Sequence, residues 1–277
     1  MVTSESNSVI DSVFHHLIRL GYERIIRIAD LDKIDRSLLP YALHALGGTQ
    51  EHTKKLQKML QSSNQSMPGN HYIHKSLNLV RGGSPKRLLH NATVVGASCR
   101  DALSSCIGSY DFPIVIIDDA TETPELSSLL PLAKFGVQKL LLGGDSGRLT
   151  NQEAGFSQSL FSRLNKSSEN SAKLTTQYRC HNDVIDVINN AFYDDVIISG
   201  MSSSDRPKVV AGLPNFCFYD VTGTSGNNEQ HNPQEALFVA DIIRLLMSHG
   251  VPGTSVVVIT TDQTQVKQVQ SALQEIE

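Results

Sequence analysis

The fold is indicated by an apolar run that ends in two acids, Phe112-Pro113-Ile114-Val115-Ile116-Ile117-Asp118-Asp119. A second apolar run, residues 137–142, ends in Gly143-Gly144-Asp145, and the residues between the two runs predict a helix over 123–135. Residues 92–97 predict another strand. Nearly continuous apolar strands that alternate with helices are typical of a parallel sheet covered on both faces. Ligands of such sheets bind at the carboxyl ends of the strands, where both acidic motifs fall.

Composition predicts an ordinary folded protein. The chain has 277 residues, of which 40% are hydrophobic, so it is long enough for two domains with real cores. Its net charge of −4 carries no overall signature of nucleic-acid binding, although a basic groove can lie on an acidic protein. The four cysteines lack CxxC spacing, which favours a reducing compartment. Without a signal pattern or an apolar run of ~18 residues, we expect an intracellular, non-secreted protein with no membrane partner.

The chain divides into two α/β parts, which we expect to be residues 1–152, with a helical insertion near 47–90, and residues 153–277. A polar stretch separates the two parts. Besides the elements above, the first part predicts helices over 8–20, 38–46 and 49–60, a strand over 25–28 and a polar loop over 61–85. The second part predicts a helix after Arg179, strands over 216–221 and 255–260, a helix over 234–249 and a last helix that begins near Asp262.

The acidic pair Asp118-Asp119 has two interpretations. Many phosphate-transfer sites place one carboxylate at a strand end to hold Mg²⁺ and a second to orient the attacking water. The alternative is a solvated strand end before a helix. Asp145 is similarly open, because it suits either a phosphate sensor that shares the Mg²⁺ shell or a simple turn after a buried strand.

A third motif is Gln177-Tyr178-Arg179-Cys180-His181, just before a predicted helix. A tyrosine ring can stack on a nucleobase, and a guanidinium can bind phosphate with two hydrogen bonds. The alternative is that Tyr178 and Arg179 cover a sheet edge and that His181 caps the helix. A separate group, Lys54, Lys55 and Lys58, forms a basic helix face that is either solvated or in contact with a phosphate backbone.

The sequence contains no GxxxxGK[ST] phosphate loop. The nearest stretch, Gly82-Gly83-Ser84-Pro85-Lys86, has the wrong order and no Ser or Thr after the lysine. Since the backbone of such a loop and its lysine supply much of the hold on the β- and γ-phosphates, we expect weak ATP binding or none.

The motifs occur in a characteristic order. It runs Ser6-Asn7-Ser8-Val9-Ile10-Asp11, Val94-Val95-Gly96-Ala97-Ser98-Cys99, Asp118-Asp119-Ala120-Thr121-Glu122, Gly144-Asp145-Ser146-Gly147-Arg148-Leu149, the Gln177 motif and Val258-Ile259-Thr260. This order resembles an internal piece of a superfamily 1 helicase of the Upf/senataxin-like group, with the helicase core of GRF-type zinc-finger helicases as the nearest match. The resemblance extends over almost the whole chain, and the Gln177 motif is its most specific part.

The resemblance implies an α/β fold with two RecA-like, P-loop NTPase-type parallel-sheet domains, both incomplete. It implies ATP and Mg as cofactors, single-stranded DNA or RNA as partner, and a nuclear location; any protein partner is unknown. It assigns catalytic roles to Asp118, which holds Mg²⁺ through water, to Asp119 and to Arg179, which reaches the γ-phosphate. Tyr178 stacks on adenine, and the other implied contacts are Gln177, Asp145 and Arg148 to nucleotide, and Asn7 and Ser98 to nucleic acid.

Three nucleotide-facing positions depart from the family pattern. Asp119 replaces a glutamate that polarises the attacking water, and its carboxylate falls about 1–1.5 Å short in a reaction that tolerates little misplacement. Arg148 and Glu122 each replace a glutamine. The chain also resembles a piece truncated at both ends. We therefore expect a fragment or degenerate member of an ATP-dependent helicase family with little or no activity. The alternatives are a non-catalytic module that binds nucleic acid or protein, and an unrelated nucleotide-binding α/β protein.

Overall fold

The computed structural model of the protein describes residues 1–43, 50–62, 69–79, 85–104, 107–108, 110–147, 158–165, 170–202, 204–206, 208–210, 212–222 and 232–274. The chain forms two compact units, Met1–Ala172 and Lys173–Glu277. The division predicted between residues 152 and 153 falls outside the described residues. Over the described ranges, none of the helices has the length and apolar character that a membrane crossing requires.

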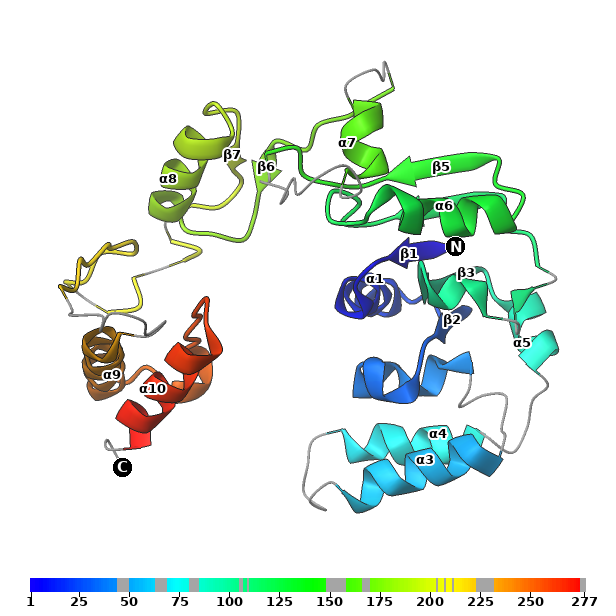
Figure 1. The fold of residues 1–277 in the computed structure, drawn as a ribbon, viewed down its shortest axis with the longest axis horizontal. Coiled ribbons are helices and arrows are strands. Elements are labelled where there is room, and N and C mark those ends of the chain that lie inside the picture. Colours follow the sequence, from blue (N-terminus) through cyan, green and yellow to red (C-terminus); the bar gives the residue numbers. More distant parts are fainter. Residues whose placement is uncertain are drawn as a thin grey trace. The chain divides into compact units, whose positions relative to one another are not determined.

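The first unit is built on a five-stranded sheet with strand order β2-β3-β1-β4-β5 (Figure 1). Every pairing is parallel, and β1 lies in the middle between β3 and β4. The predicted parallel α/β architecture is therefore confirmed. The strands are β1 (Val2–Ser4), β2 (Ile25–Ile28), β3 (Val94–Ser98), β4 (Ile114–Ile117) and β5 (Lys139–Leu142).

Helices cover both faces of this sheet, because successive strand residues point into two separate cores. On β2, Ile25 belongs to one core and its neighbour Ile26 to the other. The first core takes residues from α1 (Asn7–Arg19), η2 (Arg36–Tyr41), α3 (Gln50–Gln61) and α4 (Asn70–Leu79). The second takes residues from α5 (Pro85–Asn91), η3 (Asp101–Leu103) and the end of α6 (Glu125–Lys134). The unit also contains η1 (Leu31–Lys33) and α7 (Leu160–Asn165).

Helix α1 packs closely on the sheet at Gly96 of β3. A Cβ atom at Gly96 would lie 2.4 Å from Cε2 of Phe14, whose side chain is fully buried. The glycine is therefore needed for the close approach of the helix to the strand.

The charged side chain of Arg27, in β2, is fully buried. Its Nε donates to Asp11 Oδ1 at 2.7 Å, and its Nη2 donates to Asn7 Oδ1 at 2.6 Å. The second oxygen of Asp11 accepts from the backbone N–H of Asp35 at 2.8 Å. These bonds join β2, the first two turns of α1 and the residue before η2, and they satisfy the buried charges of Arg27 and Asp11.

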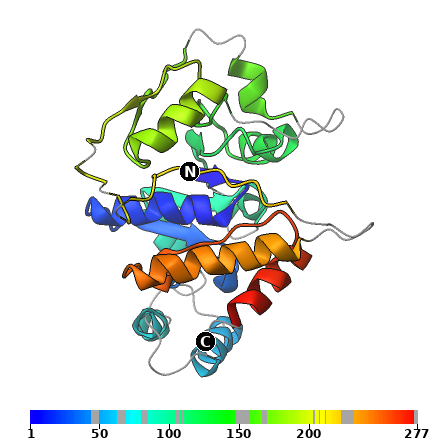
Figure 2. The same ribbon diagram turned by 90° about the vertical axis from the view of Figure 1, so that its left-hand side faces the viewer.

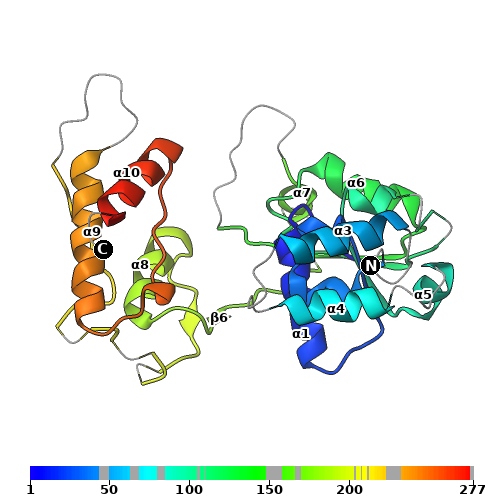
Figure 3. The same ribbon diagram turned by 90° about the horizontal axis from the view of Figure 1, so that it is seen from below.

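Helices α3 and α4 pack side by side, and α4 packs on η2 (Figure 3). Two predictions fail here. The polar loop expected over 61–85 contains α4, which is anchored by the buried residues Ile73 and Ser76. The helix expected over 38–46 begins instead as the 3-10 helix η2, which contains Pro40; the predicted part over 44–46 lies outside the described residues. A proline lacks the N–H that an α-helix interior requires.

The second unit begins with a two-stranded parallel sheet, β6 (Thr176–Gln177) and β7 (Ile198–Ser199), joined through α8 (Asn182–Phe192). Helices α9 (Pro233–Ser248) and α10 (Gln263–Gln274) pack together through small residues such as Ala236, Ala240 and Ala272 (Figures 2 and 3). The short helix η5 (Gly253–Ser255) lies between them in sequence. The oxygen Oδ1 of Asp262 accepts from Thr264 N, as expected for a residue at the start of the last helix.

The strands predicted over 216–221 and 255–260 do not form. Their residues include strongly exposed apolar side chains, with Phe218 at 85% and Ile259 at 88% exposure. A strand needs a neighbour to satisfy its backbone groups, and among the described residues neither segment has a ladder partner. The strand predictions over 216–221 and 255–260 are therefore wrong.

We expect Arg27→Met to destabilise the first unit by about 3–5 kcal/mol, because it leaves Asp11 buried without its partner. The matched control is Arg100→Met, which removes an 83% exposed arginine from its contact with Glu5 and costs at most about 0.5 kcal/mol. Urea unfolding followed by circular dichroism measures both variants. Equal midpoints for the two would contradict the role given to the buried pair.

Candidate functional site

In the first unit, the candidate site lies at the carboxyl ends of β1, β4 and β5. The backbone N–H of Asp118 donates to Thr3 O at 2.9 Å, and that of Gly143 donates to Ile117 O at 2.9 Å. These bonds extend the parallel register beyond the strands. They hold the half-buried carboxyl group of Asp118 between the end of β1 and the loop after β5.

Asp119 has a backbone conformation that few residue types adopt. Its φ angle is 52°, in the left-handed region where aspartate and asparagine are more common than other residues with a side chain. The turn is closed by Asp119 N donating to Asp118 Oδ1 at 3.0 Å and by Ala120 N donating to Gly143 O at 2.7 Å. A glutamate here would extend the carboxylate by one methylene but would fit this backbone less well.

Thr121 connects the two acidic loops. Its hydroxyl donates to Asp145 O at 3.2 Å and accepts from Asp145 N at 2.8 Å. The hydroxyl comes so close that a Cβ atom at Gly144 would lie 2.5 Å from it. Asp145 Oδ1 accepts from Gly147 N at 3.0 Å, which is the turn geometry of the simpler interpretation. Thr121 and Gly144, to which the motif comparison assigned no role, therefore determine how closely the two loops approach each other.

The carboxyl groups fit a hydrated Mg²⁺ ion better than a bare one. Over the described residues, no group of three or more His, Cys, Asp or Glu side chains could hold a metal. Magnesium commonly keeps several waters and uses one or two carboxylates together with substrate phosphates. Asp118 is suited to that arrangement, because one of its oxygens accepts from Asp119 N while the group stays half-exposed.

The second unit carries the Gln177 motif on a tight turn. The side-chain Nε2 of Gln177 donates to Cys180 O at 2.9 Å and to Ser199 Oγ at 3.0 Å. Its Oε1 accepts from the backbone N–H groups of Arg179 and Cys180, both at 2.8 Å. The side-chain amide of Gln177 therefore stabilises the turn. A nucleotide that contacted Gln177 would have to bind amide atoms that already make these hydrogen bonds.

The turn presents the side chains of Tyr178 and Arg179 to solvent. Tyr178 is 68% exposed, and its ring lies against Gly200, where a Cβ atom would come within 2.2 Å of Cε1. Arg179 is also exposed. A tyrosine face supported from behind by a glycine is suited to stacking on a planar ring. No signal in the sequence marks Gly200, because it lies 22 residues after Tyr178.

The helix-capping interpretation of His181 is confirmed. Its Nδ1 accepts from Asp183 N at 3.1 Å at the start of α8. Asn215 lies against the same group, with its Nδ2 donating to Asp183 Oδ2 at 2.9 Å. His181 therefore caps the N-terminus of α8, the helix that follows the turn.

The remaining predicted residues fall into different environments. Asn7 uses its side-chain oxygen to accept from Arg27, and Ser98 is buried with its hydroxyl donating to Asp101 Oδ2 at 2.7 Å. Arg148 lies outside the described residues.

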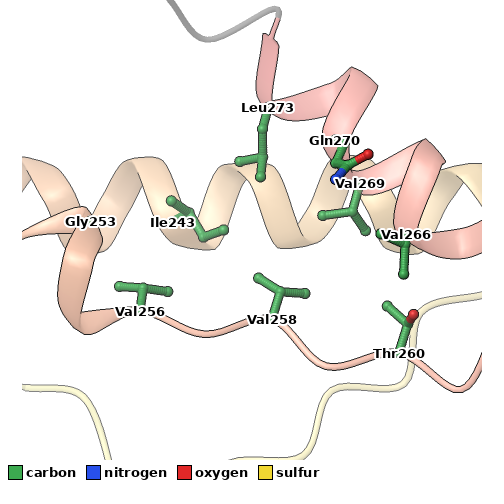
Figure 4. A pocket seen from close by; sticks show the side chains of 9 residues that line it. All are labelled: Ile243, Gly253, Val256, Val258, Thr260, Val266, Val269, Gln270 and Leu273. Atoms are coloured by element: carbon green, nitrogen blue, oxygen red, sulfur yellow. The ribbon is translucent and has the colours of Figure 1, made fainter. Parts of the chain in front are cut away.

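The second unit also contains an apolar cavity of about 400 Å³ between α9, α10 and residues 256–260 (Figure 4). Ile243, Val256, Val258, Val269 and Leu273 point into it, and Thr260 and Gln270 are its polar members. It has no charged lining residue and is unsuited to phosphate.

We expect Gly144→Ala to destabilise the first unit by about 1–3 kcal/mol, because the new methyl group overlaps Thr121. The adjacent variant Gly143→Ala is the matched control. Its Cβ atom would lie 3.3 Å from Asp118 Oδ1, a side chain that can move, so we expect a loss of about 0.5 kcal/mol. Chemical unfolding compares the two. A larger loss at Gly143 would contradict the account of Thr121.

Comparisons with known proteins agree with this geometry. Two AAA domain families match the chain, one over residues 46–150 and one over residues 156–277. The 5'-3' DNA helicase ZGRF1 of Mus musculus is 32% identical over 289 residues, which cover 100% of this chain and 16% of that protein. Helicase sen1 of Schizosaccharomyces pombe is 30% identical over 209 residues, 69% of this chain and 12% of its own length.

ATP-dependent helicase upf1 of Schizosaccharomyces pombe is 28% identical over 215 residues, which cover 74% of this chain and 23% of that protein. The chain thus spans less than a quarter of the length of each of these relatives. Matches to both AAA domains, in the order of the motifs, accompany a parallel sheet with acids at its carboxyl edge. The chain belongs to the Upf1-like family of superfamily 1 helicases.

Proposed function

We propose that this chain binds single-stranded DNA or RNA, that it binds ATP with Mg²⁺ only weakly, and that by itself it hydrolyses little or no ATP. The observation that carries the proposal is the contrast between two motifs. The Tyr178–Arg179 turn is fully built and exposed, whereas the position of the water-polarising glutamate is held by Asp119.

The nucleotide side of the proposal rests on Tyr178, Arg179 and Asp118. By family resemblance, Tyr178 would stack on adenine, Arg179 would contact the γ-phosphate, and Asp118 would hold a hydrated Mg²⁺ that offsets phosphate charge. Asp145 lies on the loop that Thr121 joins to the loop of Asp118, which supports a contact of Asp145 with the same phosphate. Gln177 acts as a positioning residue, because its four hydrogen bonds shape the turn. Arg148 belongs to the proposal only through the family motif.

The proposed lack of turnover rests on Asp119. Its carboxylate is one methylene shorter than that of the family residue, and its left-handed backbone favours the shorter side chain. A reacting water is sensitive to a misplacement of about 1 Å, which can cost about 100-fold in rate. The 277 residues also contain no GxxxxGK[ST] motif to hold the phosphates.

The proposed binding of single-stranded nucleic acid is supported by the side-chain amide of Asn7. The amide oxygen of Asn7 accepts from Arg27, so the NH₂ group of the same amide is turned away from the guanidinium and can donate to a phosphate. The hydroxyl of Ser98 donates to Asp101, so Ser98 would contact the nucleic acid through its backbone groups. The single-stranded partner, DNA or RNA, and the nuclear location enter the proposal by family resemblance alone.

We expect the 277-residue chain to show no strand-stimulated ATP hydrolysis. Phosphate release is measured by malachite green with and without single-stranded DNA and RNA. The baseline is Asp118→Asn, which removes the Mg²⁺-binding charge, and the wild-type chain should match it. A wild-type rate that exceeds this baseline and rises with added strand would refute the lack of turnover.

Nucleotide binding should depend on the seat of Tyr178. Gly200→Ala displaces the ring, and we expect it to weaken TNP-ATP binding about tenfold, because stacking on one base is worth ~1–3 kcal/mol. Gly253→Ala is the control, since a Cβ atom there meets nothing within 4 Å. Fluorescence titration measures both, with Tyr178→Ala as the full loss. Strand binding without any nucleotide binding would instead support the non-catalytic module.

A further inference from the structure

The helices α3 and α4 are basic in an otherwise acidic chain. Residues 50–79 contain four lysines and one glutamate, whereas the net charge of the whole chain is −4. Such an asymmetry often marks the surface that meets a polyanion. Of these lysines, Lys55 forms an ion pair with Asp32 at 3.0 Å.

A hollow of about 270 Å³ lies where α1, η2 and α4 meet. Its lining combines cationic and aromatic side chains from all three elements. Helix α1 contributes His15 and Arg19, η2 contributes Ser37 and Tyr41, and α4 contributes Tyr72 and Lys75. We call it the Arg19–Lys75 hollow.

The floor of the hollow is held by hydrogen bonds. His15 Nε2 lies 2.7 Å from Ser37 Oγ, and that hydroxyl donates to Asp35 Oδ1 at 2.5 Å. The backbone N–H of Asp35 in turn donates to Asp11, the partner of buried Arg27. The hollow is therefore anchored to the same network that fixes α1 on the sheet. The Ser37 hydrogen bond also lowers the pKa of Asp35, so this carboxylate stays charged and occupied with its own partners.

The two cations of the rim are available for a ligand. Within the described part of the chain, neither Arg19 nor Lys75 has a hydrogen-bond or ion-pair partner, and both are exposed. Three acids of this region are paired with other cations: Asp11 with Arg27, Asp30 with Lys33 and Asp32 with Lys55. Asp35 lies beside the hollow, where it contacts Ser37 and His15. Among the described residues, the two cations Arg19 and Lys75 therefore outnumber the one carboxylate, that of Asp35, beside the hollow.

We propose that the Arg19–Lys75 hollow binds a segment of single-stranded nucleic acid, a contact separate from that of Asn7. Arg19 and Lys75 bind backbone phosphates, and the rings of Tyr41 and Tyr72 receive a base. A basic groove with aromatic faces is the recurring chemistry of single-strand binding, whereas a duplex hides the base faces that tyrosines need. The proposal rests on the strand-binding part of the proposed function.

The test is fluorescence anisotropy of a labelled single-stranded oligonucleotide over a series of salt concentrations. The double variant Arg19→Gln with Lys75→Gln should flatten the dependence of log affinity on log salt by about 1.4, at ~0.7 per phosphate contact. Tyr41→Leu keeps the packing bulk, and we expect it to weaken binding about tenfold with the salt slope unchanged. The matched control is Lys139→Gln with Lys208→Gln, which removes the same charge elsewhere and should leave the slope unchanged.

The outcomes separate this inference from the proposed function. If the wild-type chain binds the strand but the Arg19/Lys75 variant behaves as the Lys139/Lys208 control, the hollow is overturned and the function stands. A wild-type chain that binds no strand removes both. A loss of TNP-ATP affinity in the Arg19/Lys75 variant would place nucleotide in the hollow and also overturn the inference. Thermal melting confirms that each variant is folded.

Discussion

The buried pair of Arg27 and Asp11 is the interaction on which most of the first unit depends. A guanidinium with no exposed surface needs an ion-pair and hydrogen-bond partners inside the protein. Asp11, Asn7 and backbone carbonyl groups are those partners. Because these partners belong to α1 and β2, the pair sets how the first helix lies on the sheet. The same network reaches Asp35, and through it the floor of the Arg19–Lys75 hollow. Both proposed nucleic-acid contacts, Asn7 and the Arg19–Lys75 hollow, thus depend on the buried pair of Arg27 and Asp11.

The two units contribute different chemistry. The carboxyl edge of the sheet carries the carboxylates of Asp118, Asp119 and Asp145, on two loops that Thr121 joins, and we propose a magnesium site there. The Gln177 turn offers an aromatic face and a guanidinium held by a side-chain amide. The Gln177 turn is held by side-chain hydrogen bonds, whereas Asp119 places a short acid on a backbone in the left-handed region.

The sequence predicted strands β2 to β5 of the first unit from their apolar runs, but it missed the central strand β1 (Val2–Ser4), and β5 is largely exposed. From the same apolar runs it placed Asp118 and Asp145 at one sheet edge. It missed α4, since a helix rich in Asn, His and Ser hides its few anchoring residues, such as Ile73. It could not foresee the support of Tyr178 by Gly200, or the bonds that occupy Gln177 and Ser98, because these contacts join distant residues. In the second unit, residues 255–260 are apolar enough for a strand, but a strand also requires a neighbouring strand to pair with.

The central claim is that Tyr178 still receives the adenine ring. It is tested most directly by NMR of the chain with ring-labelled tyrosine, titrated with a non-hydrolysable ATP analogue and Mg²⁺. The chain has seven tyrosines, and Tyr178→Phe identifies the signal of interest. The account predicts a saturable ring-current shift of the Tyr178 resonance, larger than that of any other tyrosine. A Tyr178 signal that stays unmoved while the analogue binds would contradict it.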